Sequence, residues 1–158
     1  MNKNRKIIFA PWSCSNKNYY AFQTWYHPLS KIFKNIITFD PMEVMNLHGH
    51  DEMNRMFLEM INKEQPDYVF LWMIIDEFSL DTLMQIKKVS PKTKVLNFCS
   101  DDDTIFDSYS IYMSEFVDYF LITHKEYMPR YKNKAFLSLA TDTDTFKPLN
   151  LEKIYREL

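Results

Sequence analysis

Three consecutive carboxylates are the residues of this chain that most directly suggest chemistry. Asp101, Asp102 and Asp103 follow a strand-like apolar run that ends at Cys99. Neighbouring carboxylates repel one another, so the cluster indicates a partner: a polar ligand, a helix N-terminus or a cation. A carboxylate accepts a hydrogen bond from a ligand hydroxyl and can take its proton as that hydroxyl attacks. Asp102 and Asp103 are therefore candidate catalytic residues, and Asp101 is a candidate substrate-binding residue.

A structural role for the same carboxylates stays open. Asp is a common N-cap where a strand leads into a helix, and the helix dipole stabilises an acidic residue in the first turn by roughly 0.3–1 kcal/mol. The sequence alone does not separate this role from ligand contact.

Further candidate substrate-binding residues follow other predicted strands. Trp12, Ser13, Asn16 and Tyr19 lie after the first strand, and His124 lies directly after the fifth. The two aromatic residues can stack on the ring of a ligand or pack in the core. His124 can contact a phosphate or act as a base, and it can equally be a capping or surface residue.

The segment His48–Glu52 contains residue types that ligate metals. Imidazoles and carboxylates at this spacing can share a cation. The alternative is a solvated turn in which Gly49 permits the bend and Asp51 and Glu52 open a helix. We favour the turn and expect no metal site.

Short apolar segments alternate with segments of helical periodicity along the whole chain. Most of the apolar segments carry no polar alternation, which is typical of parallel strands covered by helices on both faces. Six strands are predicted: Lys6–Ala10, Asn35–Phe39, Asp67–Trp72, Lys94–Cys99, Tyr119–Ile122 and Ala135–Leu139.

Three helices are the clearest of the intervening segments. Apolar residues recur at three- and four-residue steps over Tyr19–Phe33, where His27 and Pro28 predict a kink, and again over Asp51–Asn62. Ser79 is the expected N-cap of a helix over Leu80–Val89. The methionines of the middle helix are expected in the core: Met53, Met56 and Met60.

This alternation predicts an α/β fold, a three-layer Rossmann-like doubly wound parallel sheet of about six strands in a single domain. We assign residues 1–148 to that domain and residues 149–158 to the start of an interdomain connection or a C-terminal helix. Such sheets bind ligands beyond the carboxyl ends of their strands. The loops expected there are Pro11–Asn18, Asp40 with Pro41, Met73–Glu77, Ser100–Asp103 and Thr123 with His124.

Composition narrows the function classes. The 158 residues carry a net charge of -2, which argues against the basic field that nucleic-acid binding needs. The single glycine excludes a glycine-rich phosphate loop. The apolar run Ile7–Pro11 is too short for a membrane span or a signal sequence, so a cytoplasmic protein is expected. Cys14 and Cys99 lack zinc-type spacing and are expected to be reduced thiols.

The chain resembles the N-terminal half of a GT-B glycosyltransferase, particularly the bacterial group of CgeB-like spore-maturation proteins and related glycosyltransferase 1-4-like proteins. Weaker similarity lies in Trp25–Leu29 and Phe39–Pro41, and the glycine expected after the family's first strand is missing here. The most specific similarity lies in four places: Val95–Asp103, Val117–Thr123, Tyr131 and Leu139–Pro148, the last with Asp142 and Asp144 in the expected interdomain segment.

The resemblance implies the acceptor-binding half of a bacterial hexosyltransferase that uses a nucleotide-sugar donor. It implies that the donor binds a separate C-terminal domain, in cis or in trans, that a sugar or glycan is the acceptor, and that this chain alone is inactive and holds no cofactor. The alternative hypothesis is a non-enzymatic Rossmann-like interaction module. A homodimer is compatible with either hypothesis.

Overall fold

A six-stranded parallel sheet forms the centre of the molecule. The computed structural model describes residues 4–74 and 76–138, apart from the side chain of Asp102. The strand order is β2-β1-β3-β4-β5-β6, and every neighbouring pair is parallel. The predicted Rossmann-like doubly wound fold is therefore confirmed. The strands are β1 (Lys6–Pro11), β2 (Asn35–Thr38), β3 (Tyr68–Trp72), β4 (Lys94–Cys99), β5 (Tyr119–Ile122) and β6 (Lys134–Phe136).

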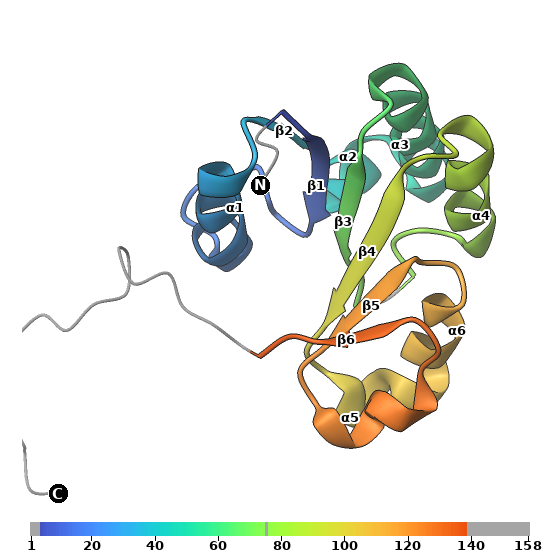
Figure 1. The fold of residues 1–158 in the computed structure, drawn as a ribbon. Helices are drawn as coiled ribbons and strands as arrows, with labels where there is room; N and C mark the ends of the chain where they lie inside the picture. Colours follow the sequence, from blue (N-terminus) through green and yellow to red (C-terminus); the bar gives the residue numbers. More distant parts are fainter. Residues whose placement is uncertain (1–3, 75, 139–158) are drawn as a thin grey trace, which may run out of the picture.

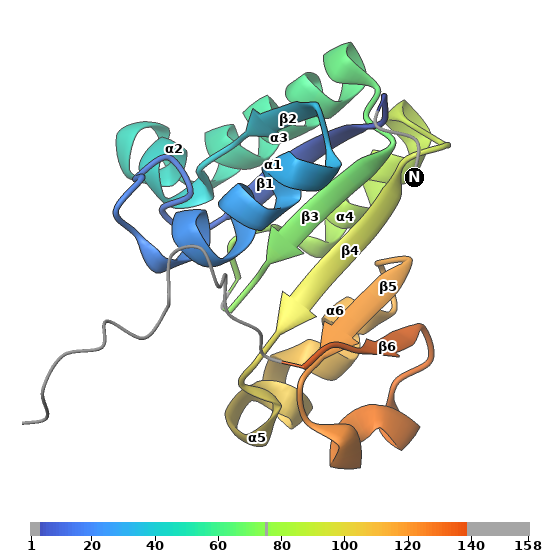
Figure 2. The same ribbon diagram turned by 60° about the vertical axis from the view of Figure 1, so that its left-hand side comes forward.

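Helices cover both faces of the sheet (Figures 1 and 2). A π-helical turn, η1 (Phe22–Tyr26), and α1 (His27–Ile32) lie on one face. The longer helices lie on the other face: α2 (Pro41–His48), α3 (His50–Glu64) and α4 (Leu80–Val89). Short helical segments follow β4 and β5: α5 (Asp102–Ile105), η2 (Phe106–Ser110), α6 (Ile111–Ser114) and the 3-10 helix η3 (Lys125–Arg130).

A hydrophobic core lies on each side of the sheet. On the side of α3 and α4, Met53 is fully buried, and Met56 and Met60 pack partly buried against the core, as predicted. On the side of α1, the Trp25 ring packs 5.0 Å from that of Phe70 and 4.6 Å from that of Phe98, measured between ring centroids. The strands between these cores are apolar on both faces because both faces are covered.

Local signals place the helix boundaries. Ser79 accepts a hydrogen bond from the Thr82 N–H and caps α4, as predicted. The segment Tyr19–Phe33 is divided at His27, where the π-helical turn gives way to α1 with Pro28 in its first turn. The helix α2 was not predicted from the sequence. Gly49 separates α2 from α3 with φ +86°, a conformation that glycine adopts without strain.

None of the helices in the described part of the chain has the length and apolar character needed to cross a membrane.

Asp118, directly before β5, joins three elements at the amino end of the sheet. Its carboxylate accepts hydrogen bonds from Lys87 of α4, from the Val95 N–H at 2.8 Å and from the Lys94 ammonium at 2.9 Å. Burial acts to raise the pKa of this carboxyl, but the hydrogen bonds from Lys87, Val95 and Lys94 outweigh it and hold the pKa below its ordinary value. The ionised carboxylate is therefore more stable in the folded chain than in the unfolded one.

Asp118→Asn is expected to lower the free energy of unfolding by about 1–2 kcal/mol at pH 7. Because the folded pKa is depressed, this contribution is fully present above the unfolded pKa and disappears as the pH falls through the folded pKa. Urea unfolding of both proteins from pH 7 down to pH 3 measures the difference. Asp107→Asn, which removes an exposed ion pair with Arg130, is the matched control. A difference that stays constant with pH would contradict the assigned role.

Candidate functional site

The site lies where the strand order reverses. β1 pairs with β2 on one side and with β3 on the other. The connection from β1 to β2 therefore runs toward one edge of the sheet, and the strands from β3 onward are added toward the opposite edge. Doubly wound sheets bind ligands in the crevice that this reversal opens at the carboxyl ends of the strands. The register pairs Pro11 with Trp72, which brings Trp12 and Met73 out of the sheet side by side.

A small aromatic cavity of about 60 Å³ occupies this position. The rings of Tyr20 and Trp72 meet edge to face, with centroids 5.9 Å apart, and Trp25 packs behind Trp72 with centroids 6.5 Å apart. The cavity brings together Trp12 and Tyr19, both of which were predicted as substrate-binding residues. Six residues line it: Trp12, Tyr19, Tyr20, Ala21, Trp72 and Ile74.

The indole N–H groups of Trp12 and Trp72 are both buried, and neither makes a hydrogen bond within the described residues. Both nitrogen atoms are shielded from contact with a water-sized group, so an oxygen atom in the cavity cannot accept from them without a rearrangement of the wall. What the cavity offers a ligand is therefore mainly the apolar surface of its aromatic rings.

Asp40, directly after β2, fixes the loop that carries Trp12 and Tyr19. Its buried carboxylate accepts hydrogen bonds from the Ser13 N–H at 3.2 Å, from the Ser15 N–H at 3.2 Å and from the Ser15 hydroxyl at 2.8 Å. It also accepts from the Glu43 N–H at 3.2 Å, which makes it the N-cap of α2. One carboxylate therefore holds the β1 loop and a helix start in fixed relation.

Ser13 and Asn16, both predicted to bind substrate, make bonds that shape this loop. Ser13 has φ +49°, and its N–H is taken by Asp40. The Asn16 side chain accepts from the Asn18 N–H at 3.0 Å, and its carbonyl accepts from the Tyr19 N–H at 2.9 Å. These contacts position Tyr19 at the cavity.

The Asp cluster lies at the same edge of the sheet, beyond β4. Asp101 accepts from the Ser100 hydroxyl at 3.0 Å, and its carbonyl accepts from the Thr104 and Ile105 N–H groups at the start of α5. Asp103 is exposed, and the side chain of Asp102 lies outside the described residues. The backbone of Asp101 thus starts a helix, and the Asp103 side chain is exposed to solvent.

His124 follows β5, the neighbour of β4. The register pairs Cys99 with Ile122, so the segments that begin at Ser100 and Thr123 leave the sheet next to each other. The His124 Nδ1 lies 3.3 Å from the Thr123 hydroxyl, and its ring meets Tyr127 edge to face. The Asp cluster and His124 therefore occupy neighbouring loops, two strands and three strands away from β1 in the sheet.

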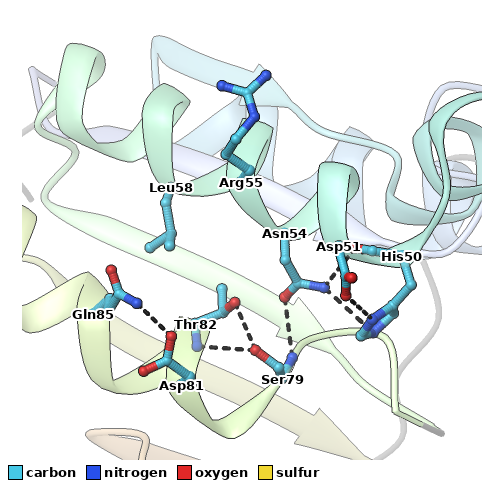
Figure 3. Close-up of a pocket in the computed structure, with 9 residues that line it drawn as sticks. All are labelled: His50, Asp51, Asn54, Arg55, Leu58, Ser79, Asp81, Thr82 and Gln85. Atoms are coloured by element: carbon cyan, nitrogen blue, oxygen red, sulfur yellow. Dashed lines mark hydrogen bonds and ion pairs between the residues drawn. The ribbon is translucent and has the colours of Figure 1, made fainter.

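A second hollow, of about 320 Å³, lies between α3 and α4 (Figure 3). Its polar groups bond to one another: the Asn54 amide donates to the His50 carbonyl at 2.9 Å, and its oxygen accepts from the Ser79 N–H at 3.0 Å. The His50 Nε2 lies 2.8 Å from the Asp76 carbonyl oxygen. These bonds tie α3 to the loop after β3, so we assign this hollow a structural role.

The described residues hold no group of three or more His, Cys, Asp or Glu side chains placed to bind a metal ion. In the segment His48–Glu52, His48 is exposed at the end of α2, while Asp51 and Glu52 lie in the first turn of α3. The predicted helix opening at these two acids is confirmed.

Both cysteines are buried, and no disulfide joins them in the part of the chain that the structure describes. The Cys14 thiol lies 3.3 Å from the Phe39 carbonyl oxygen. Burial, together with the nearby charge of Asp40, raises the pKa of this thiol to about 12. Cys14 is therefore a packing residue beneath the β1 loop and a poor nucleophile.

Three residues of the cavity wall were not predicted from the sequence: Tyr20, Ala21 and Trp72. Asp40 and Ile74 lie in loops that were predicted at this edge of the sheet, but no role was predicted for either residue. Trp72 is the last residue of an apolar strand. An aromatic residue at such a position is equally consistent with burial in the core and with ligand binding. The position of Trp72 beside Trp12 follows only from the pairing of β1 with β3. The adjacent tyrosines at positions 19 and 20 were the one available signal for Tyr20.

No protein-family model, curated protein or solved structure matches this chain. The glycosyltransferase resemblance stays a prediction from the sequence. The candidate site therefore rests on its geometry.

Asp40→Ala is expected to lower the free energy of unfolding by about 2–3 kcal/mol, because it removes a helix cap and three bonds to the β1 loop. It should also expose Cys14 to iodoacetamide at pH 8, since it loosens the loop and removes the charge that raises the thiol pKa. Mass spectrometry of the peptides measures alkylation at each cysteine, with Cys99 as the internal control.

Asp51→Ala, at an exposed acid in the first turn of α3, is the matched control and should leave Cys14 protected. Equal protection of Cys14 in the Asp40 variant would show that Asp40 does not hold the loop.

Proposed function

We propose that this chain is the acceptor-binding half of a GT-B glycosyltransferase. The observation that carries the proposal is the aromatic cavity at the reversal of strand order, with Trp12, Tyr19, Tyr20 and Trp72 in its lining. The Asp cluster and His124 at the same edge of the sheet add polar groups suited to hydroxyl chemistry.

A neutral sugar matches this cavity better than a charged ligand. A pyranose presents C–H surface that packs on aromatic rings. The lining carries no charged side chain, so burial of a charged ligand there would be uncompensated.

The proposal assigns the other roles as the resemblance implies. Asp102 and Asp103 serve as the base or bind the acceptor hydroxyls, and Asp101 and His124 contact the acceptor or donor. The nucleotide-sugar donor binds a second domain, joined to this one or supplied separately, in a bacterial cytoplasmic enzyme. This division fits a chain with one glycine and hence no glycine-rich phosphate loop.

The chain is expected to bind neutral sugars and to show no affinity for nucleotide sugars by itself. Saturation-transfer NMR against hexoses, amino sugars, N-acetylated amino sugars and their disaccharides identifies binders, and tryptophan fluorescence gives their affinity, since two of the three tryptophans line the cavity. Trp12→Ala should weaken sugar binding by tenfold or more, which corresponds to about 1.4 kcal/mol.

Tyr119→Ala removes an aromatic residue that is 47% exposed on β5, outside the cavity, and serves as the control. The proposal is wrong if no sugar binds the folded chain, or if the Trp12 and Tyr119 variants bind like the unmodified chain. A polypeptide that adds the donor-binding domain and still transfers or hydrolyses no nucleotide sugar would also contradict it.

A protein-interaction module is the second candidate function. Leu80 and Met84 of α4 are 42% and 46% exposed, and Tyr112 of α6 is 59% exposed. Leu80 and Tyr112 line one shallow hollow of about 230 Å³, and Met84 lines another with Phe116. Apolar residues gathered on an exposed surface are typical of contact sites.

If this surface joins two copies of the chain, the protein should sediment as a dimer, and Met84→Glu should make it monomeric by burying a charge in the interface. Analytical ultracentrifugation at several protein concentrations decides the question. Lys88→Glu, an exposed change on the same helix, is the control for charge alone. A monomer at all concentrations excludes this form of the second candidate.

A further inference from the structure

A hollow of about 230 Å³ lies at the carboxyl edge of the sheet, between the loop after β3 and the helical segments that follow β4. An apolar protein cavity of roughly 150 Å³ holds a benzene molecule, so this hollow has room for a small organic group. The proposed sugar-binding function uses none of its residues. The lining joins two residues near the start of α4 to four residues of η2 and α6: Asp76, Leu80, Ser108, Tyr109, Tyr112 and Met113.

Asp76 is the one charged residue among the described residues of this lining. Its backbone carbonyl oxygen lies 2.8 Å from the His50 Nε2 atom. Its carboxylate, in contrast, makes no hydrogen bond or ion pair with any residue that the structure describes. The nearby Asp107, next to Ser108 in the sequence, pairs with Arg130 at 2.6 Å. Asp76 therefore brings a negative charge to the hollow that these residues leave uncompensated.

A second acid adds to the negative potential of this hollow. The buried Glu77 follows Asp76, and its carboxylate accepts from the Ile74 N–H at 3.0 Å. Burial, and then the charges of Glu77 and Asp76, raise the pKa of the Tyr109 hydroxyl, so both acids lie close to this lining residue. No lysine, arginine or histidine belongs to the described lining. A cation is therefore the ligand that this potential attracts.

The rest of the lining favours an organic cation over a metal ion. A metal ion needs several oxygen, nitrogen or sulfur ligands, and the described residues hold no group of three or more acidic, histidine or cysteine side chains placed to supply them. Leu80 and Met113 offer apolar surface to an alkyl chain. Tyr109 and Tyr112 are aromatic, and a tyrosine ring attracts a cation that lies over its face.

The acceptors in the lining specify the kind of organic cation. The Ser108 hydroxyl donates to the Ile105 carbonyl at 3.4 Å, so its oxygen can still accept a hydrogen bond. Together with the Asp76 carboxylate it suits a primary ammonium group, which donates three hydrogen bonds, better than a quaternary one, which donates none. A wholly apolar ligand would cover the Asp76 carboxylate without giving it a donor.

We propose that this hollow binds a primary alkylammonium group of the size of a lysine side chain, with its nitrogen at Asp76 and its alkyl chain against Leu80 and Tyr112. A small free amine and a lysine side chain of a polypeptide both carry this group. The inference is independent of the proposed sugar-binding function, because the aromatic cavity and this hollow share no lining residue.

Three four-carbon probes test the inference on the unmodified chain: n-butylamine, 1-butanol and butyrate. NMR of methionine methyl groups follows binding at pH 7 through the Met113 signal, assigned with Met113→Leu. The ammonium ion should bind about tenfold tighter than the alcohol, because a hydrogen bond between charged groups is roughly twice as strong as a neutral one. Butyrate should bind weakest. Added salt should weaken binding of the ammonium ion and leave that of the alcohol unchanged.

Two matched variants assign the preference to Asp76. Asp76→Asn keeps the size of the side chain and removes its charge, so the tenfold preference for the ammonium ion should fall to about threefold or less. Asp81→Asn removes an equal charge from an exposed acid that is next to Leu80 in the sequence and outside the lining, and it should keep the preference. Circular dichroism verifies that both variants are folded.

A fourth probe, Nα-acetyl-lysine N-methylamide, distinguishes the two sources of the group. If it binds like butylamine, the site takes lysine side chains of polypeptides, and if it fails to bind while butylamine binds, the site takes free amines. The inference is overturned if the Met113 signal does not respond to butylamine, or if the alcohol binds as tightly as the ammonium ion. Equal loss of the preference in the Asp76 and Asp81 variants would also overturn it.

Discussion

The four hydrogen bonds accepted by Asp40 are the interaction on which the candidate site depends. A buried carboxyl group needs hydrogen-bond donors to replace the water that it loses, and here the donors come from two segments, the β1 loop and the start of α2. Ser13 adopts a left-handed conformation that is sparsely populated outside glycine, so the loop has its shape only while Asp40 holds it. Trp12 and Tyr19 flank that loop. The cavity wall therefore follows from one carboxylate.

The other wall of the cavity belongs to the sheet, since Trp72 is part of β3. Trp72 leaves β3 beside Trp12, and the rings of Trp25, Phe70 and Phe98 pack behind it as part of the core beneath α1. A binding wall that continues into a hydrophobic core needs little reordering when a ligand arrives. The polar groups after β4 and β5 lie at the same edge, so one end of one sheet offers both an apolar recognition surface and carboxylates.

The fold could be predicted from the sequence because strands and helices are marked by local patterns of residues. The candidate site could be predicted only in part, because it depends on contacts between residues that are far apart in the sequence. β4 and β5 have the predicted bounds, since each is an apolar run closed by polar residues. α2 was missed because only Asp40 and Pro41 mark its start, and the same pair also fits a turn. The sequence identifies Trp72 only as a strand residue, because its place next to Trp12 depends on the pairing of β1 with β3. The left-handed Ser13 has no signal in sequence, since its conformation is imposed by a residue 27 positions away.

The indole N–H signals of the three tryptophans give the most direct test of the central claim, that a sugar binds against the aromatic wall of this cavity. A ¹⁵N-correlated NMR spectrum, recorded while methyl glycosides are added, follows each indole separately after assignment by the Trp→Phe variants. The account predicts that the signals of Trp12 and Trp72, which line the cavity, shift as the sugar binds and that the Trp25 signal moves least. Signals that stay fixed while a sugar binds, or a shift confined to Trp25, would contradict it.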